Sequence, residues 1–314
     1  MASEAFSLSP DTANPPQNST ILVTGGAAGI GLATALYLHT PQYKNNVVVL
    51  DRSTSPPAVQ DLTSSSRFLY IQCDVTSWQS QLDAFSKAAS HFGRLDHVFV
   101  NAGVSETGEQ IFTDHLDGNG ELREPDRRTI DIDIRAVGDT LKLAVYHLRN
   151  DSGEKQKGSG KGKGGSICMT ASLAGYLASA GAPVYSAAKH GVVGYMRALK
   201  GDCAKVGIAI SVVAPGITLT AIILGFKEGQ SLQDWGKEMQ DRGVAINNAE
   251  TVGLTVSHIF GLGMKASGSG YLIQANRVKE IEGGIAKTRE QWMGKEMLGL
   301  FRGGRDAPLF PNKL

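Results

Sequence analysis

The chain has 314 residues, with 31 Lys and Arg against 30 Asp and Glu and a formal net charge of +1. This balance argues against a binder of nucleic acid or of anionic membranes, which depend on an excess of positive charge. Hydrophobic residues make up 41% of the sequence and charged residues 19%, which is sufficient for a sizeable core and excludes global disorder.

The first 18 residues are polar and contain three prolines, so the sequence predicts a flexible N-terminal leader (1–18). The leader has neither the basic start nor the apolar run of a secretory signal, and no stretch of the chain is long and apolar enough for a membrane span. Cys73, Cys168 and Cys203 lie far apart among apolar residues, which predicts buried, reduced thiols. We therefore expect a soluble cytoplasmic protein without a metal site.

Short β-branched runs alternate with longer helical patterns from Ser19 onward. The expected strands are 21–24, 47–50, 68–71, 97–100, 166–170 and 208–214, with a possible seventh at 271–275. Strands separated by helix-length segments predict a parallel sheet. Since no second core or linker is visible, the sequence predicts one α/β domain over residues 19–284.

One segment interrupts this pattern. Residues 150–165 are rich in Gly, Lys and Ser, which predicts a flexible surface insertion before the next strand. Its lysines leave open a phosphate-rich partner, but the low net charge of the whole chain favours a solvated loop.

A glycine-rich turn follows the first expected strand directly. The chain reads TGGAAGIG at residues 24–31 and continues into an apolar helical pattern. Glycines there let backbone amides approach a pyrophosphate at a helix N-terminus. Because the turn lies between a strand and a helix, a dinucleotide site is favoured over simple packing of small residues. The residues expected to contact the cofactor are Gly25, Ala28, Gly29, Ile30 and Gly31.

Asp51 ends the second expected strand, 20 residues beyond Gly31. A carboxylate at this position accepts hydrogen bonds from ribose hydroxyls and repels a 2'-phosphate, so NAD is favoured over NADP. Arg52 leaves NADP possible, because its guanidinium can either stack on adenine or pair with a 2'-phosphate.

Tyr185 and Lys189 are four residues apart in a segment with helical periodicity, which puts both side chains on one helix face. A neighbouring ammonium favours the phenolate form that an acid/base catalyst needs. This spacing alone occurs often by chance. Ser172 strengthens it, because it follows the strand expected at 166–170 and its hydroxyl can reach the same pocket.

These motifs together resemble the short-chain dehydrogenase/reductase family, over nearly all of residues 19–284. The resemblance rests on the glycine turn at 24–31, Asp74-Val75, Asn101-Ala102-Gly103, Ser172, Tyr185 with Lys189, and Pro215-Gly216, all in the family order. It implies a Rossmann-type doubly wound parallel sheet and an NAD(P)-dependent oxidoreductase that interconverts a secondary alcohol and a ketone.

The resemblance also implies roles for individual residues. Tyr185 would be the general acid/base, Ser172 would hydrogen-bond the substrate oxygen, and Lys189 would bind the nicotinamide ribose. The remaining residues expected at the cofactor are Asp74 and Val75 at the adenine, Asn101, Ala102 and Gly103 along its central part, and Pro215, Gly216 and Ile217 with Thr218 or Thr220 at the carboxamide.

Asp133 marks a departure from the family pattern, because many members carry Asn in the helix that follows Asn-Ala-Gly. Its carboxylate can still accept a hydrogen bond, but its charge favours ammonium at Lys189 and partly offsets the effect of Lys189 on Tyr185. We expect Asp133 to belong to the catalytic group and alcohol oxidation to have an alkaline optimum.

The substrate pocket is expected to draw on the loop after Asn-Ala-Gly, the residues after Ser172 and the apolar residues that follow Pro215. The apolar set comprises Ile222, Ile223, Leu224, Phe226, Trp235 and Met239, and suits either a mobile lid over a hydrophobic alcohol or ketone or ordinary core packing. The C-terminal extension (285–314) can pack on the domain, cover the pocket or join subunits. The resemblance implies a homodimer or homotetramer, and the tail and leader look most like those of fungal secondary-metabolism enzymes.

A competing reading is a cofactor-binding protein with a non-redox role, such as a cyclase, a lyase or a sensor on the same scaffold. Such relatives have usually lost the tyrosine or the lysine. Because Ser172, Tyr185 and Lys189 are all present, the sequence favours the oxidoreductase.

Overall fold

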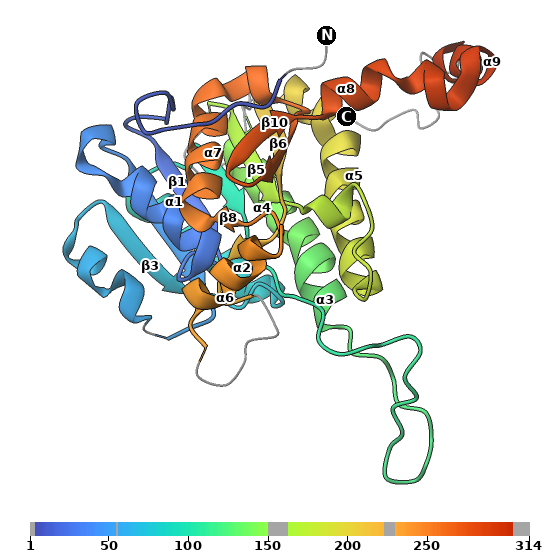
Figure 1. The fold of residues 1–314 in the computed structure, drawn as a ribbon. Coiled ribbons are helices and arrows are strands. Elements are labelled where there is room, and N and C mark those ends of the chain that lie inside the picture. The colour runs from blue at the N-terminus through green and yellow to red at the C-terminus, as the bar shows by residue number, and fades with distance from the viewer. Residues whose placement is uncertain (1–3, 55, 150–162, 223–229, 304–314) are drawn as a thin grey trace.

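The fold is given by a computed structural model that describes residues 4–54, 56–149, 163–222 and 230–303 (Figure 1). Within these ranges, eight strands form one sheet in the order β10-β9-β6-β5-β4-β1-β2-β3. The strands are β1 (Thr20–Thr24), β2 (Asn46–Asp51), β3 (Phe68–Gln72), β4 (His97–Val100), β5 (Gly165–Thr170), β6 (Ile208–Pro215), β9 (Gly270–Gln274) and β10 (Arg277–Glu280). Two further short strands, β7 (Thr218–Leu219) and β8 (Asn247–Asn248), pair with each other.

All seven expected strands are present, and all neighbours in the large sheet are parallel except β9 and β10. β10 is short and largely charged, and the sequence pattern did not predict it. The turn before it is tight, because Ala275 and Asn276 both adopt left-handed backbone angles (φ 47° and 59°). Such paired angles close a two-residue hairpin, which explains the antiparallel return.

Helices cover both faces of the sheet (Figure 1). The helices are α1 (Gly29–His39), α2 (Trp78–Phe92), α3 (Arg128–Ile130), α4 (Ala136–Leu148), α5 (Pro183–Lys205), α6 (Leu232–Asp241), α7 (Ala249–Leu262), α8 (Glu282–Lys287) and α9 (Arg289–Gly303). A π-helical turn, Asp131–Arg135, joins α3 to α4.

Alternate residues of each central strand enter opposite cores. In β1, Ile21 and Val23 pack with α1 and α7, whereas Leu22 packs with α2, α4 and α5. Because both faces are covered, all five residues of the strand are buried, and the three between Thr20 and Thr24 are apolar. The strand order reverses between β1 and β4, which in a doubly wound sheet opens a crevice at the carboxyl ends of the strands.

The N-terminal segment is packed, which differs from the expected flexible leader. Phe6 and Val278 exchange two backbone hydrogen bonds of 2.8 Å, so the segment pairs with β10. Phe6 and Leu8 also contact the apolar core beneath. An edge strand presents unpaired N–H and C=O groups, and this pairing satisfies some of those of β10.

Two segments extend from the domain. The first, which we call the arm (residues 107–127), leaves the domain after β4 and returns at α3 (Figure 1). The second is the C-terminal pair α8 and α9, which projects from the opposite side in the same view. Most of the large apolar side chains of α9 are exposed, namely Trp292, Met297, Leu300 and Phe301.

The expected insertion at 150–165 falls mostly on residues 150–162, which lie outside the described residues. Cys73, Cys168 and Cys203 are buried and free, as expected. Within the described part of the chain, no helix has both the length and the apolar character needed to cross a membrane. The His, Cys, Asp and Glu residues described form no group suited to a metal ion.

Candidate active site

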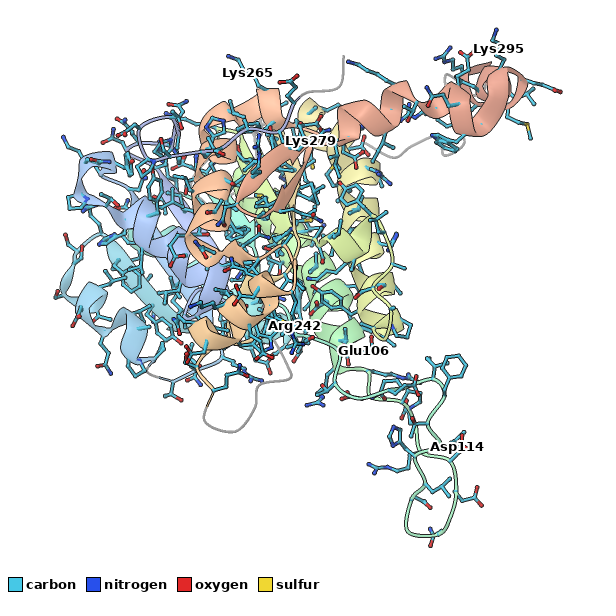
Figure 2. The ribbon with its side chains drawn as sticks, viewed as in Figure 1. Glu106, Asp114, Arg242, Lys265, Lys279 and Lys295 are labelled. Carbon is cyan, nitrogen blue, oxygen red and sulfur yellow. The ribbon has the colours of Figure 1, made fainter. Side chains whose placement is uncertain are left out.

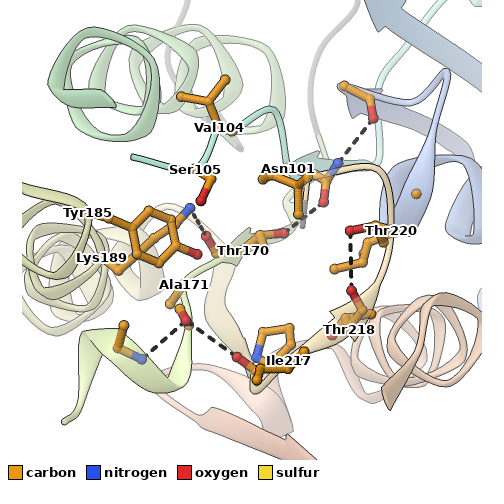
Figure 3. Close-up of a pocket in the computed structure, with 18 of the residues that line it drawn as sticks. Asn101, Val104, Ser105, Thr170, Ala171, Tyr185, Lys189, Ile217, Thr218 and Thr220 are labelled. Atoms are coloured by element: carbon orange, nitrogen blue, oxygen red, sulfur yellow. Dashed lines mark hydrogen bonds between the residues drawn. The ribbon is translucent and has the colours of Figure 1, made fainter. Parts of the chain in front are cut away.

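A pocket of about 980 Å³ lies at the carboxyl ends of the central strands. Its walls include Gly25 after β1 and Pro215 at the end of β6. Asn101 after β4 and Thr170 at the end of β5 line the same pocket (Figure 3). The topology explains this convergence, because the carboxyl ends of parallel strands meet at one edge of the sheet.

The glycine turn forms one wall of the pocket and fits a pyrophosphate. Gly25, Ala28 and Gly29 line the pocket and present no side chain larger than a methyl group at these three positions. Ala28, the N-cap of α1, makes no side-chain capping bond, so backbone N–H groups of the first helical turn are free to bind an anion. Gly25 and Gly29 have φ of 63° and 53°, a region that favours glycine.

Gly31 supports the turn without lining the pocket. A Cβ at Gly31 would lie 2.2 Å from the carbonyl oxygen of Gly25 and 2.6 Å from the side-chain nitrogen of Asn101. Any larger residue would therefore push the turn away from the strand. Ile30, the remaining residue expected here, does line the pocket.

The side chain of Asn101 links the glycine turn to the neighbouring strands by hydrogen bonds. Its Nδ2 donates to the carbonyl oxygens of Thr24 and Gly25, both at 3.2 Å, and its Oδ1 accepts from Thr170 Oγ1 at 3.0 Å. These bonds use the side-chain amide to hold the pocket floor, while Ala102 and Gly103 line the pocket beside it.

Asp51 and Arg52 both line the pocket at the end of β2. The Asp51 carboxylate accepts the backbone N–H of Ala27 at 3.1 Å and that of Ser53 at 3.2 Å. The carboxylate is thus fixed beside the glycine turn, where a ribose would follow the pyrophosphate.

Asp74 and Val75 are not among the residues that line this pocket. Asp74 Oδ1 instead accepts the N–H and hydroxyl of Thr76, at 2.9 and 2.7 Å, in the turn that leads into α2. The carbonyl oxygen of Val75 accepts from Gln81 Nε2 at 2.6 Å. In this structure both residues shape the entry to α2.

Tyr185 and Lys189 lie one turn apart on α5, and both line the pocket (Figure 3). Lys189 is buried, with its Nζ 5.4 Å from the centre of the Tyr185 ring. The same Nζ donates to the carbonyl oxygen of Thr170 at 3.1 Å. These contacts confirm the shared helix face expected from the four-residue spacing.

Asp133 lies behind Lys189, in the π-helical turn. Its Oδ2 is 3.0 Å from Lys189 Nζ, and its Oδ1 accepts the N–H of Val104 at 2.8 Å. Burial lowers the pKa of Lys189, but the charges of Asp133 and Tyr185 outweigh this effect and leave the pKa above its usual value. The ammonium near Tyr185 is therefore retained at alkaline pH.

Ser172 lines the same pocket as Tyr185 and is the N-cap of the 3₁₀ turn Leu173–Gly175. Its Oγ accepts the N–H of Ala174 at 3.1 Å and donates to the carbonyl oxygen of Pro215 at 3.4 Å. The hydroxyl is thus oriented by the backbone while its side chain lines the pocket.

The loop after β6 completes the pocket. The lining residues include Pro215 at the end of β6, Gly216 and Ile217 after it, Thr218 in β7, and Thr220. Thr220 Oγ1 donates to the carbonyl oxygen of Thr218 at 3.3 Å, which holds the loop in a tight turn.

Part of the expected lid lines the pocket, and part does not. Ile222 and Trp235 are lining residues, whereas Met239 is not among them. Ile223, Leu224 and Phe226 lie outside the described residues.

The segments after Asn-Ala-Gly and after Ser172 contribute to the pocket walls, as expected, through residues that were not named individually from the sequence. These are Val104, Ser105 and Thr107 after β4, and Ala178, Ser179 and Ala182 before α5. Their position just after Asn-Ala-Gly and between Ser172 and Tyr185 was the available signal. Their small size gave no other indication of a role.

The doubly wound sheet and this pocket, together with the family model and the dehydrogenase relatives that match the chain, identify an NAD(P)-dependent oxidoreductase that acts on CH–OH groups. More specifically, the chain belongs to the short-chain dehydrogenase family. The model of this family, described as short chain dehydrogenase, matches residues 19–230.

Curated relatives agree with this assignment. Short-chain dehydrogenase/reductase prx4 of Penicillium rubens is 32% identical, over 87% of this chain and 80% of its own length. The 5'-hydroxyaverantin dehydrogenase of Dothistroma septosporum is 30% identical, over 67% of this chain and 71% of its own. Human 15-hydroxyprostaglandin dehydrogenase, whose name includes NAD(+), is 33% identical over 67% and 72%.

Solved structures share the fold. Levodione reductase is 22% identical with a TM-score of 0.64, covering 83% of this chain and 97% of its own. A 3-ketoacyl-(acyl-carrier-protein) reductase from Brucella melitensis, complexed with NADH, is 16% identical with a TM-score of 0.65, covering 82% and 98%. At these identities the likeness concerns the fold alone.

Proposed function

We propose that the protein interconverts a hydrophobic secondary alcohol and its ketone, using NAD(H) in preference to NADP(H), with Tyr185 as the general acid/base. The observation that carries the proposal is the placement of Tyr185 and the buried Lys189 on one face of α5, at the wall of the pocket. The retained Ser172 on the same lining supports a redox role over a cyclase, lyase or sensor.

In alcohol oxidation, the phenolic oxygen of Tyr185 accepts the hydroxyl proton of the substrate, and in ketone reduction it returns a proton to the carbonyl oxygen. A nicotinamide cofactor, when bound, accepts or supplies the hydride. The Ser172 hydroxyl hydrogen-bonds the same substrate oxygen and so fixes its distance from Tyr185. The ammonium of Lys189 stabilises the phenolate electrostatically, and Asp133 keeps that ammonium charged.

A preference for NAD is supported by Asp51. Its carboxylate lies on the pocket wall beside the glycine turn, held there by the N–H of Ala27. Ribose hydroxyls can donate to it, whereas a 2'-phosphate would meet its negative charge. Arg52 also lines the pocket, and its guanidinium would favour NADP if it paired with a 2'-phosphate.

A hydrophobic substrate is supported by the part of the pocket beyond the cofactor residues. Leu173, Ala174, Ala178, Ile222 and Trp235 provide mainly apolar surface there. Apolar walls with a few polar groups are typical of sites for small organic ligands. Relatives named for hydroxyaverantin and hydroxyprostaglandin also point to hydroxylated organic molecules.

Turnover of a bicyclic substrate tests the proposal. We expect oxidation of tetralol with NAD, followed by absorbance of the reduced cofactor, to exceed oxidation of isopropanol at equal concentration by at least tenfold in kcat/KM. Faster turnover of isopropanol would refute the hydrophobic substrate class. If neither cofactor bound, as measured by calorimetry, the redox function itself would be refuted.

We also propose a homodimer or homotetramer in the cytoplasm. The exposed apolar side chains of α9 support an oligomer, and the three buried free thiols are in keeping with a reducing compartment. Light scattering after gel filtration measures the mass in solution, and a monomer at micromolar concentration would contradict the first statement. Cell fractionation tests the second.

A further inference from the structure

Glu106 is a buried carboxylate that the proposed reaction does not use. It lies where the arm leaves the domain (Figure 2), and only 8% of its surface is exposed. Its Oε2 accepts the backbone N–H of Tyr185 at 2.9 Å, while its Oε1 is buried without a hydrogen-bond partner among the described residues. Burial of a carboxylate is costly, so this placement calls for a compensating role.

The helix that carries Tyr185 lacks an N-terminal acceptor of its own. Helix α5 begins at Pro183, and its N-cap, Ala182, has no side chain that could accept a hydrogen bond. Tyr185 is the third residue of the helix, the position whose N–H an N-cap side chain usually satisfies. Glu106, 79 residues earlier in the chain, provides that acceptor. Its negative charge is also favourable at the positive end of the helix dipole.

The segment that carries Glu106 is tied to Lys189 as well. Val104 donates its N–H to Asp133, and Asp133 pairs with Lys189. These contacts therefore form a closed ring. One side runs from Lys189 through Asp133 and Val104 to Glu106. The other side runs from Glu106 to the backbone of Tyr185 and along one turn of α5 back to Lys189. Ser105, between Val104 and Glu106, lines the pocket.

We propose that Glu106 is a positioning residue, which fixes Tyr185 and the pocket wall at Ser105 in one arrangement by closing this ring. The carboxylate does not line the pocket, so it acts through the backbone of Tyr185 and not on the substrate. Without it, the first turn of α5 loses its acceptor, and residues 104–106 lose their attachment to the helix. The catalytic consequence rests on the proposed function of Tyr185, whereas the structural link does not.

Hydrogen exchange followed by mass spectrometry tests the link without a substrate. In Glu106→Ala, we expect amide exchange to accelerate about fivefold both in the first turn of α5 and in residues 102–106, the size of effect that loss of a cap produces. Glu106→Gln keeps an oxygen acceptor at the same length, so we expect exchange within twofold of the wild type. Glu121→Ala, an exposed change in the arm, is the matched control and is expected to alter neither segment.

Kinetics with tetralone and NADH then separate positioning from general destabilisation. We expect Glu106→Ala to lower kcat about tenfold while the KM for NADH stays within twofold, with recovery of kcat in Glu106→Gln. A uniform increase of exchange across the sheet, with a matching loss of thermal stability, would overturn the proposal and show that Glu106 only supports packing.

Unchanged amide exchange in Glu106→Ala would overturn the proposal. Exchange in Glu106→Gln that accelerates as much as in Glu106→Ala, in the first turn of α5 and in residues 102–106, would also overturn it. If Glu106→Ala does not fold, Glu106→Asp replaces it, because the side chain shortened by one methylene withdraws the acceptor from Tyr185. Failure of the wild type to reduce tetralone would refute the proposed substrate class. The exchange experiment would still decide the role of Glu106.

Discussion

Asp133 and Lys189 form an ion pair inside the protein, with 3.0 Å between Oδ2 and Nζ and side-chain exposures of 0% and 5%. Each charge compensates the other, since an isolated ion at this depth would be strongly unfavourable. Lys189 Nζ lies 5.4 Å from the centre of the Tyr185 ring. Asp133 accepts the N–H of Val104, which lines the pocket. The state of one buried pair thus affects both the acid/base group and the shape of the site.

The pH dependence of activity tests this pair. Because the pKa of Lys189 is raised, the ammonium persists until the pH exceeds the usual lysine value of about 10.4. We expect the rate of tetralol oxidation to rise toward alkaline pH without a decline below about pH 10. In Asp133→Asn, the pKa of Lys189 falls, and the decline moves to lower pH. A wild-type maximum below about pH 7 would contradict this expectation.

The same substitution tests stability. A group whose pKa is raised by folding contributes stability that is complete below its unfolded pKa and is lost as pH rises through the folded value. At neutral pH we expect Asp133→Asn to lower the free energy of unfolding by about 3 kcal/mol, because a buried ammonium loses its partner. The control is Asp131→Asn, whose exposed pair with Arg135 is worth less than about 1 kcal/mol. Urea titration measures the free energy of unfolding of both variants. Equal losses would show that the buried pair stabilises the protein no more than the exposed pair does.

Removal of the phenolic hydroxyl tests the acid/base assignment. We expect Tyr185→Phe to lower kcat about a thousandfold, within the range for loss of a general acid/base, with NADH affinity within threefold of the wild type. Tyr195→Phe on the same helix is the control, because Tyr195 is not among the pocket residues. Steady-state rates and fluorescence titration make the comparison. Retention of a tenth or more of the activity in Tyr185→Phe would assign the proton transfer to another group.

Cofactor choice is tested at Asp51. We expect Asp51→Ala to weaken NAD binding about tenfold, since charge-assisted hydrogen bonds to ribose are lost, and to improve NADP binding as the repulsion disappears. Asp61→Ala, at an exposed carboxylate in the 3₁₀ helix Pro57–Ser64, is expected to change neither affinity. Calorimetry with both cofactors measures the effect. Tighter binding of NADP by the wild type would indicate that Arg52 recognises the 2'-phosphate.

Because of His97, at the start of β4, we expect the protein to become less stable in acid. Burial lowers the pKa of His97 to about 3, and its ring stacks on Phe260 with 4.8 Å between centroids. The unfolded chain takes up a proton near pH 6.5 while the folded state does not, so stability falls as pH decreases from 6.5 toward 3. We expect about 2 kcal/mol less stability at pH 5 than at pH 7 from this residue.

Urea unfolding at both pH values measures the difference. His97→Gln is expected to reduce it, because the glutamine side chain does not titrate. His115→Gln, in the exposed arm, is expected to leave the difference unchanged. An equal pH dependence in the wild type and His97→Gln would exclude His97 as the cause.

Much of the fold could be predicted from the sequence because the signals are local. The apolar runs at 21–24 and 47–50 correspond to β1 and β2, since strands covered on both faces must be apolar throughout. The position of the N-terminal segment could not be predicted in this way. Its attachment depends on a backbone pairing between Phe6 and Val278, which are 272 positions apart, and backbone groups carry no sequence signature.

The sequence by itself determined the parallel α/β sheet, the glycine turn and the Tyr185–Lys189 spacing, because periodicity and helix geometry fix these within a few residues. Only the tertiary structure decided that Glu106 reaches the N–H of Tyr185 and that Asp133, which the family pattern had already connected with Lys189, contacts it directly at 3.0 Å. No local signal distinguishes Glu106 from the many carboxylates on protein surfaces, and the family pattern did not show that Asp133 would be buried. Their roles arise when strands and helices distant in the chain bring a donor to each carboxylate and exclude water from it.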